Sequence, residues 1–286
     1  MPCALIAGCG YVGRVVADLL TADGWALECW TLSPSSASEL SAKGYQAQAV
    51  DISNQQDVAA RKAHFDAVIH CASTRGGDVD LYRRVYLRGA SNLIECFNEA
   101  KILFTSSTSV YAHSNGEWVT EDSTAAPKHA SGQILIETEQ LVLSAGGIVA
   151  RLGGIYGPDR SALLKRFLSG EASVDPQTDR FVNQIHRDDV ATALQFLLKS
   201  GSAAGQIYNV VDDQPILLSE CYRWMATKLE RPLPRPGGSI SHRKRGDSNK
   251  RVSNAKLRSA GWSPQYPTFA AGMGKSVLPS FGLSIA

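Results

Sequence analysis

The 286-residue sequence has no long hydrophobic run and almost no net charge, and both absences narrow what it can be. No uninterrupted apolar stretch reaches the ~18 residues that a membrane-spanning helix needs. The start, Met1-Pro2-Cys3-Ala4-Leu5, has no cationic segment, and the first charge is Arg14, so we expect no secretory signal. A formal charge of +2, with 44% hydrophobic and 20% charged residues, is typical of globular proteins and excludes disordered and collagen-like classes.

The sequence also lacks the ligand spacing of metal sites and the paired cysteines of disulfide scaffolds. Neither a Cys-x-x-Cys nor a His-x-x-x-His pattern occurs among its six cysteines and six histidines. The cysteines are scattered at Cys3, Cys9, Cys29, Cys71, Cys96 and Cys221. We therefore expect reduced thiols, a cytoplasmic protein and no built-in metal site.

Short apolar runs alternate with helical patterns over the first two-thirds of the chain. The predicted strands are 4–7, 26–32, 47–50, 67–70, 102–105, 147–152 and 207–211. The predicted helices are 11–22, 36–42, 55–62, 79–100, 131–144 and 188–199. This alternation predicts an α/β fold, a Rossmann-type doubly wound parallel sheet covered on both faces.

After Gly157-Pro158 the rhythm breaks into shorter elements, which predicts a smaller C-terminal substrate lobe. The expected division is a dinucleotide-binding domain of residues 1–155 plus about 184–212, and a substrate lobe of about 156–183 and 213–286.

A glycine pattern follows the first predicted strand and opens the first helix: Gly8-Cys9-Gly10-Tyr11-Val12-Gly13. Gly8 permits a tight turn, Gly10 lets a pyrophosphate approach the backbone, and Gly13 lets helix and strand pack closely. The first N–H groups of the helix, with Tyr11 and Val12, would face the anion. A turn that merely packs tightly is the alternative. The surrounding strand–helix–strand pattern favours a dinucleotide site.

The end of the second strand normally selects the cofactor, through an acid for NAD or a cation for NADP. Here it reads Thr31-Leu32-Ser33, with neither. Ser33, Ser35 and Ser36 could donate hydrogen bonds to a phosphate, which favours NADP slightly within a general NAD(P) prediction. A helix cap at Ser35 or Ser36 explains these hydroxyls equally well.

Asp51-Ile52 follows the third strand and could accept a hydrogen bond from the adenine amino group. A helix N-cap at Asp51 or Ser53 is an equally good explanation.

Three later segments carry a family resemblance. They are 105–111 (Thr-Ser-Ser-Thr-Ser-Val-Tyr), 151–158 (Arg-Leu-Gly-Gly-Ile-Tyr-Gly-Pro) and 186–190 (His-Arg-Asp-Asp-Val). By these the chain resembles the extended short-chain dehydrogenase/reductases, the NAD-dependent epimerase/dehydratase family. Ile207-Tyr208-Asn209-Val210 and residues 250–262 are similar to later landmarks of the same family.

The resemblance implies that NAD(P) lies across the strand ends and that a sugar nucleotide or similar substrate sits under the C-terminal lobe. Cys71, Ala72 and Ser73, after His70, would line the cofactor, and Gly153-Gly154-Ile155 would run past the nicotinamide. Tight packing is the alternative for these glycines.

The family's catalytic residues are mostly absent. Its tyrosine acid/base corresponds to Ser131, its lysine to Leu135 and its asparagine to Tyr86, whereas Ser107 fits the serine position. A hydroxyl with a free pKa near ~10 or above needs a neighbouring cation to act near neutral pH, and Leu135 supplies none. The combination is similar to atypical subgroups that lack the Tyr-x-x-x-Lys pair.

Other side chains could replace them. Ser107 is the strongest catalytic candidate, although its hydroxyl could instead cap a turn. Tyr111 is a weaker one, as are three further residues near the expected strand ends: Tyr156, His113 and His129. His186 precedes a predicted helix start where Asp188 or Asp189 would cap, and a structural role is expected for it.

Positive charge concentrates near the C-terminal end. Residues 231–258 hold nine Lys and Arg against Asp247 alone, a net charge of +8. Arg245 and Arg251 could bind substrate phosphates, or the segment could be a solvated loop. The patch is short and has no interleaved aromatics, so we expect a small-molecule substrate, without nucleic-acid or membrane partners, and leave a homodimer open.

Two functions compete at this stage. One is an NAD(P)-dependent oxidoreductase or epimerase-like enzyme, which the nucleotide-binding half favours. The other is a catalytically silent protein that senses NADP(H) or a metabolite, which Ser131 and Leu135 favour.

Overall fold

The computed structural model describes residues 1–61, 63–74, 76–175, 177, 179–237 and 248–284. The strands are β1 Cys3–Ala7, β2 Ala26–Thr31, β3 Ala47–Ala49, β4 Ala67–His70, β5 Lys101–Ser107, β6 Glu117–Val119, β7 Ile148–Leu152, β8 Gly154–Tyr156, β9 Ser173–Val174, β10 Phe181–Val182, β11 Gln184–His186, β12 Ile207–Val210, β13 Ile216–Leu217, β14 Arg235–Pro236 and β15 Lys250–Val252. The α-helices are α1 Gly13–Ala22, α2 Pro34–Ser41, α3 Gln55–Ala59, α4 Val79–Tyr82, α5 Gly89–Cys96, α6 Ala130–Ser144, α7 Ala162–Leu168, α8 Arg187–Lys199, α9 Leu218–Lys228, α10 Ala255–Ser259, α11 Phe269–Gly272 and α12 Leu278–Ser280. Shorter helical segments are the π-helices η1 Arg83–Arg88 and η5 Met273–Val277 and the 3₁₀-helices η2 Thr108–Val110 and η4 Gly201–Ala203.

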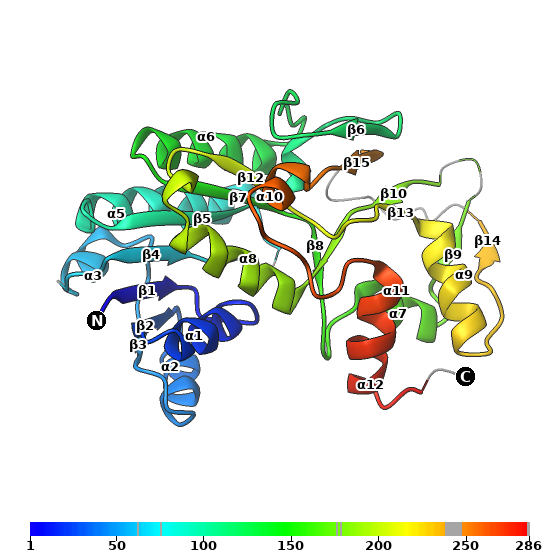
Figure 1. Cartoon of the computed structure of the whole chain (residues 1–286), viewed down its shortest axis with the longest axis horizontal. Helices are drawn as coiled ribbons and strands as arrows, with labels where there is room; N and C mark the ends of the chain where they lie inside the picture. Colours follow the sequence, from blue (N-terminus) through cyan, green and yellow to red (C-terminus); the bar gives the residue numbers. More distant parts are fainter. Residues whose placement is uncertain (62, 75, 176, 178, 238–247, 285–286) are drawn as a thin grey trace. The chain divides into compact units, whose positions relative to one another are not determined.

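Seven strands form one sheet in the order β12-β7-β5-β4-β1-β2-β3. The pairs β1–β2, β1–β4, β2–β3 and β4–β5 are parallel. Every residue of β4 (Ala-Val-Ile-His) and of β7 (Ile-Val-Ala-Arg-Leu) is buried, as expected of strands covered on both faces. Helices α1 and α8 lie on one side of the sheet and α5 and α6 on the other (Figure 1). The predicted doubly wound α/β fold is confirmed.

The predicted helix 79–100 is interrupted in the structure. It runs as α4, then η1, then α5, and ends at Cys96. A helical pattern of apolar residues does not distinguish i→i+4 from i→i+5 hydrogen bonds, so the π-helical segment could not be predicted from it.

The chain forms two compact units. Unit 1 comprises Met1–Val110, Ala125–Arg151 and Ala191–Tyr208, and unit 2 comprises Tyr111–Thr124, Leu152–Val190 and Asn209–Ala286. Residues 111–124, 152–155, 184–190 and 209–212, expected in the first domain, thus belong to unit 2. The reason for 111–124 is a pairing between distant segments, since β6 adds to β15 in parallel. Strand pairing over more than 130 residues leaves no local signal in the sequence.

Unit 2 has its own apolar core. Tyr156, Phe167, Met225, Phe269 and Met273 are among its buried members, contributed by β8, α7, α9, α11 and η5. Within the described ranges, none of the helices is long and apolar enough to cross a membrane.

Candidate dinucleotide site

The glycine turn between β1 and α1 is so tight that Gly8 has no room for a side chain and Gly13 has very little. Gly8 has φ +96°, and a Cβ there would lie 2.3 Å from the Ala72 backbone nitrogen. A Cβ on Gly13 would lie 3.0 Å from the Gly8 oxygen and 3.1 Å from Ile6 Cγ2. Gly8 therefore allows the turn to pass against the segment after β4, and Gly13 lets α1 pack closely on β1.

Gly10 differs from the other two glycines because the space that a Cβ would occupy is open. The nearest heavy atom to a Cβ there is the Gly8 oxygen at 3.9 Å. The backbone nitrogens of Gly8 and Cys9 donate to the Trp30 oxygen at 3.0 and 2.9 Å, and Gly10 N donates to Gly8 O at 2.7 Å. These bonds fix the turn on β2 and leave the Gly10 face clear for an approaching group.

Helix α1 starts directly at this turn, with Val12 at its N-cap position. The apolar Val12 side chain cannot accept a hydrogen bond from the first turn, where Arg14 N donates to the Gly10 oxygen at 3.1 Å. The helix start thus has no side-chain cap that would compete with an anion. Tyr11 and Val12 are both half-buried. A ten-residue helix that starts at a glycine turn without a side-chain cap suits a pyrophosphate.

The serines after β2 form the start of α2. Ser33 is the N-cap, and its Oγ accepts from Ser36 N at 3.2 Å. It also donates to Ser36 Oγ at 2.9 Å and lies 3.2 Å from Ser35 Oγ. The cap expected at Ser35 or Ser36 is thus two or three residues earlier, at Ser33, because Pro34 occupies the first helical position.

Asp51 forms a turn of its own rather than a helix cap. Its Oδ1 accepts from Ser53 N at 2.9 Å and from Ser53 Oγ at 2.7 Å. The N-cap of α3 is Asn54, whose side chain accepts from the first-turn nitrogens, so the cap expected at Asp51 or Ser53 was wrong by one to three residues. The competing Asx turn at Asp51 delays the helix start.

Ile52 is held in this loop from the opposite helix, a contact that sequence reasoning missed. The buried Asn92 Nδ2 donates to the Ile52 oxygen at 2.8 Å. A Cβ on Gly89 would lie 2.8 Å from Ile52 Cδ1. The one sign of this contact in the sequence was an asparagine, Asn92, three residues after a glycine, Gly89, on the same helix face.

The segment after β4 meets the glycine turn. Cys71 N donates to the Ala7 oxygen at 2.8 Å, and burial raises the pKa of the Cys71 thiol to about 12. Ala72 contacts Gly8, and Ser73 is exposed. Burial lowers the pKa of His70 to about 4, so its imidazole is neutral at pH 7. This segment thus supplies packing and backbone to the turn rather than charge.

Ser107 ends β5 and lies half-buried at the carboxyl edge of the sheet. Its Oγ accepts from Ser109 N at 3.2 Å, so the hydroxyl caps the turn into η2. Because β1, β4 and β5 run parallel, their carboxyl ends meet at one edge, and Ser107 shares that edge with the glycine turn and Ala72. The hydroxyl proton remains available to a ligand while the oxygen accepts from the backbone.

Ser131 and Leu135 lie on α6, which packs against β5 and η2. Ser131 is half-buried in the first turn, and Leu135 is only 4% exposed. The position that would carry a cation beside an acid/base hydroxyl is thus an apolar, buried contact.

A buried ion pair lies one helical turn beyond Leu135. Glu139 accepts from Arg151 Nη2 at 2.6 Å and from Arg151 Nε at 3.0 and 3.1 Å, and Ser106 Oγ donates to it at 2.5 Å. Both charged side chains are at most 4% exposed. The bond ties α6 to β7. Its signal in the sequence was a lone arginine inside an apolar strand, Ile-Val-Ala-Arg-Leu.

The candidates in unit 2 have structural surroundings. Tyr111 is fully buried, and its hydroxyl donates to Asn209 Oδ1 at 2.9 Å. A Cβ on Gly153 would lie 3.0 Å from the Asn183 oxygen, and Ile155 pairs with Ile185. Tight packing accounts for Gly153, and Tyr111 is a core residue that we do not retain as a catalytic candidate.

The four aromatic alternatives are equally constrained or peripheral. Tyr156 is 1% exposed, and burial raises the pKa of its hydroxyl. His113 is half-buried and His129 is exposed at the start of α6. His186 is fully buried with Nε2 2.9 Å from Ser276 Oγ, as its expected structural role requires.

The first turn of α8 corrects the predicted cap. Asp188 N donates to His186 Nδ1 at 3.2 Å, so the imidazole caps the helix. Asp189 instead accepts from the backbone nitrogens of Gln265 and Tyr266 at 2.6 and 3.0 Å. The carboxylate is buried against a distant loop that the local sequence does not reveal.

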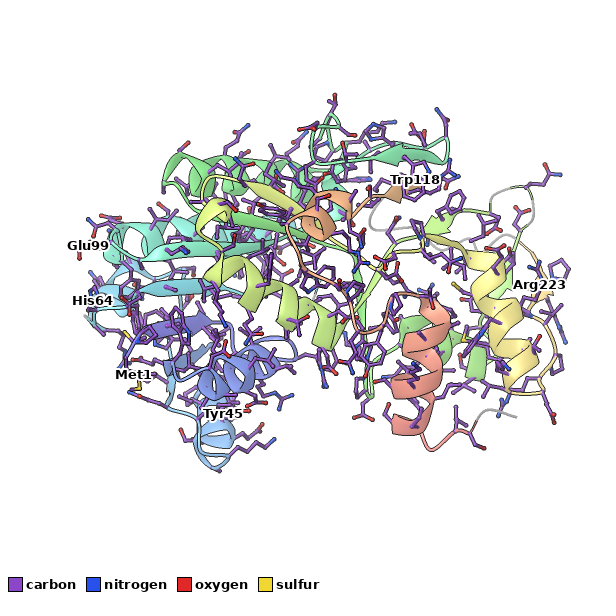
Figure 2. The ribbon with its side chains drawn as sticks, in the orientation of Figure 1. Met1, Tyr45, His64, Glu99, Trp118 and Arg223 are labelled. Carbon is purple, nitrogen blue, oxygen red and sulfur yellow. The ribbon has the colours of Figure 1, made fainter. Side chains whose placement is uncertain are left out.

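Arg251 is engaged within unit 2, whereas Arg245 lies outside the described residues. Arg251 Nε donates to the Gly116 oxygen at 2.7 Å, and its guanidinium lies 5.2 Å from the Trp118 ring and 5.1 Å from the Phe181 ring. Trp118 is 54% exposed at the surface of β6 (Figure 2). Nowhere in the described part of the chain do three His, Cys, Asp or Glu side chains gather as metal ligands would.

The sequence matches a protein family and a curated relative over most of its length. The family model of the NAD dependent epimerase/dehydratase family matches residues 4–210. Protein YeeZ of Escherichia coli K12 is 27% identical over 274 residues, which cover 92% of this chain and 95% of YeeZ.

Two solved structures share the fold across the whole chain. A UDP-glucose 4-epimerase from Brucella ovis in complex with NAD has a TM-score of 0.82 at 16% identity and covers 100% of both chains. A UDP-glucose 4-epimerase from Thermotoga maritima with UDP-glucose has a TM-score of 0.81 at 16% identity and covers 99% of both. With the family match over residues 4–210 and the glycine turn between β1 and α1, the chain belongs to the NAD-dependent epimerase/dehydratase family.

Proposed function

We propose that this protein binds NAD(P) at the Gly8–Gly13 turn and acts as an oxidoreductase or epimerase/dehydratase-type enzyme. The substrate would be the hydroxyl or carbonyl group of a sugar nucleotide or similar small molecule. The observation that carries the proposal is the turn itself: Gly8 leaves no space for a Cβ, Gly13 leaves very little, and the space beside Gly10 is open. A relative of this fold in complex with NAD and another with UDP-glucose support it.

The cofactor would supply the hydride chemistry, and the protein would bind and orient. The uncapped start of α1 would receive the pyrophosphate. Ser107, at the carboxyl edge of the sheet, directs its hydroxyl proton toward the reacting oxygen. Ser131 has no adjacent cation to lower its pKa, because Leu135 is apolar and buried, so we assign it no proton-transfer role.

A slight preference for NADP is part of the proposal. Ser33 and Ser35 follow β2. An acidic residue at this place would repel a 2′-phosphate, and residues 31–36 contain none. In the structure the Ser33 oxygen already accepts from Ser36 N, so Ser35, which is exposed, is the hydroxyl with the greater freedom.

The finer surroundings are proposals of the same kind. The proposal of a phosphate-bearing substrate is based on the basic segment 231–258, in which Arg251 lies near two aromatic rings. The proposal of a cytoplasmic location is based on the six cysteines, which are all free. Cys71, Ala72, Asp51 and Ile155 remain proposed cofactor contacts.

A silent sensor is the second candidate, favoured by the burial of Leu135 where a catalytic cation would stand. It predicts that oxidised and reduced cofactors bind with clearly different affinities and that one of them changes binding to a protein partner. Equal affinities, together with no partner in a cofactor-dependent pull-down, would exclude it.

The first experiment is a fluorescence or calorimetric titration of the apo protein with NADPH, NADH, NADP and NAD. Saturable binding with a preference for the phosphorylated forms is expected. Failure of all four to bind would overturn the proposal.

A substrate screen by cofactor absorbance follows, with Ser107→Ala compared with Ser109→Ala. We expect Ser107→Ala to lower kcat/KM at least ~10-fold, because it removes the only hydroxyl proposed to meet the reacting oxygen, and Ser109→Ala to have little effect. A broad screen without turnover would eliminate the enzyme and leave the sensor.

A further inference from the structure

Two of the six cysteines lie beside each other at the glycine turn. Cys9 lies within the turn between Gly8 and Gly10, and Cys29 lies in β2, one residue before Trp30. The two side chains are 3% and 1% exposed, and a hydrogen bond from the Cys9 side chain raises the pKa of the Cys29 thiol. Cys9 N donates to the oxygen of Trp30, the residue after Cys29, at 2.9 Å, so the two cysteines lie side by side although they are 20 positions apart in the sequence.

The backbone holds this pair in place from both sides. Cys9 N donates to the Trp30 oxygen at 2.9 Å, and Cys29 pairs with Ile6 of β1 and with Ala47 of β3. Each thiol is free in the structure. Two neighbouring free thiols can be joined by a disulfide of ~2.05 Å once the turn shifts toward β2.

We propose that Cys9 and Cys29 form a disulfide when the protein meets a peroxide, and that this bond weakens dinucleotide binding at the turn. The second half rests on the proposed function, and the first does not. The Cys9 thiolate attacks one peroxide oxygen, becomes a sulfenic acid and releases water after proton uptake. The Cys29 sulfur then attacks the sulfenic sulfur and releases the second water. Two thiols and one hydrogen peroxide thus give one disulfide and two waters.

Oxidation would move the turn rather than the strand. β2 is paired on both edges, by β1 and by β3, so Cys29 is the fixed partner. Cys9 must therefore approach β2. Gly10 is bonded to Cys9 and moves with it. Gly8 cannot move with them because it is packed against Ala72, so the hydrogen bond from Gly10 N to the Gly8 oxygen is distorted. The N–H groups meant for the pyrophosphate are displaced, and we expect the dissociation constant for NADPH to rise at least ~10-fold.

Burial sets the rate of this reaction. The hydrogen bond from Cys9 and desolvation raise the pKa of the Cys29 thiol, so little thiolate is present while the turn is closed. A dinucleotide lying on the turn would hold it closed, and oxidation should be slower in its presence.

The test is a peptide map of the full-length protein. The protein is treated with hydrogen peroxide, its remaining thiols are alkylated, and trypsin is added without reductant. Tryptic peptide 1–14 carries Cys3 and Cys9, and peptide 15–43 carries Cys29 as its one cysteine. We expect these peptides linked, fragment ions that place the bond at Cys9, slower linkage with NADPH present, and full reversal by dithiothreitol.

NADPH affinity is measured on the same samples before oxidation, after it and after reduction. Cys29→Ser should keep the reduced-state affinity and lose the oxidative change, whereas Cys221→Ser, a buried thiol of unit 2, should behave as wild type. Oxidised Cys9 without a link to Cys29, or a linked protein with unchanged affinity, would overturn the proposal. If the reduced protein binds none of the four nucleotides, the proposed function fails, and the peptide map still decides whether the disulfide forms.

Discussion

Replacing Gly8 by alanine is expected to damage both stability and dinucleotide binding, for two separable reasons. At φ +96° an L-residue is strained, by about 1–2 kcal/mol. The new Cβ would also lie 2.3 Å from Ala72 N and 2.4 Å from Ala72 Cα. Relief of such overpacking costs about 1–3 kcal/mol more, because a backbone must shift. The expected loss in the free energy of unfolding is therefore roughly 2–5 kcal/mol.

Gly24→Ala is the matched control for this variant. Gly24 follows α1 at φ +83°, and no heavy atom lies within 4 Å of a Cβ built there. It therefore carries the backbone strain alone, about 1–2 kcal/mol, far from the turn.

The assays are urea unfolding for stability and NADPH fluorescence for affinity, both on folded protein. Gly8→Ala should weaken NADPH binding at least tenfold, which corresponds to ~1.4 kcal/mol, and Gly24→Ala should leave it unchanged. Equal losses of stability in the two variants, or wild-type affinity in Gly8→Ala, would refute the assignment of the turn.

Three further predictions concern other parts of the chain. Glu139→Gln leaves the buried Arg151 guanidinium without its counter-ion and should lower the free energy of unfolding in urea by about 3–5 kcal/mol. Adding Arg151→Met should recover part of that loss, and a loss below ~1 kcal/mol would contradict the buried pair. Burial raises the pKa of Asp189 to about 6, so the native state loses stability as pH rises from about 4 to 6, by on the order of 3 kcal/mol. Asp189→Asn should flatten that slope in denaturation at stepped pH, and an unchanged slope would refute it. Ser131→Tyr with Leu135→Lys should give no new dehydrogenase turnover by cofactor absorbance, because the lysine would enter an apolar contact that disfavours its charge; measurable turnover would show that the catalytic geometry persists.

The sequence by itself determined the layered fold and the location of the nucleotide turn. Both are local signals: strands such as 67–70 are short and apolar because they are covered on two faces, and the glycines are required by backbone space at one turn. The loss of the Tyr-x-x-x-Lys pair was equally visible, because Ser131 and Leu135 can be read directly from the sequence.

The tertiary structure alone decided which polar residues act within the protein. Tyr111 bonds Asn209, Glu139 bonds Arg151 and Asp189 bonds the 265–266 backbone, in each case across a distance in sequence that no local pattern reports. The same holds for the neighbouring thiols of Cys9 and Cys29 and for the pairing of β6 with β15. A buried polar group must find a partner, but which partner depends on how distant segments pack.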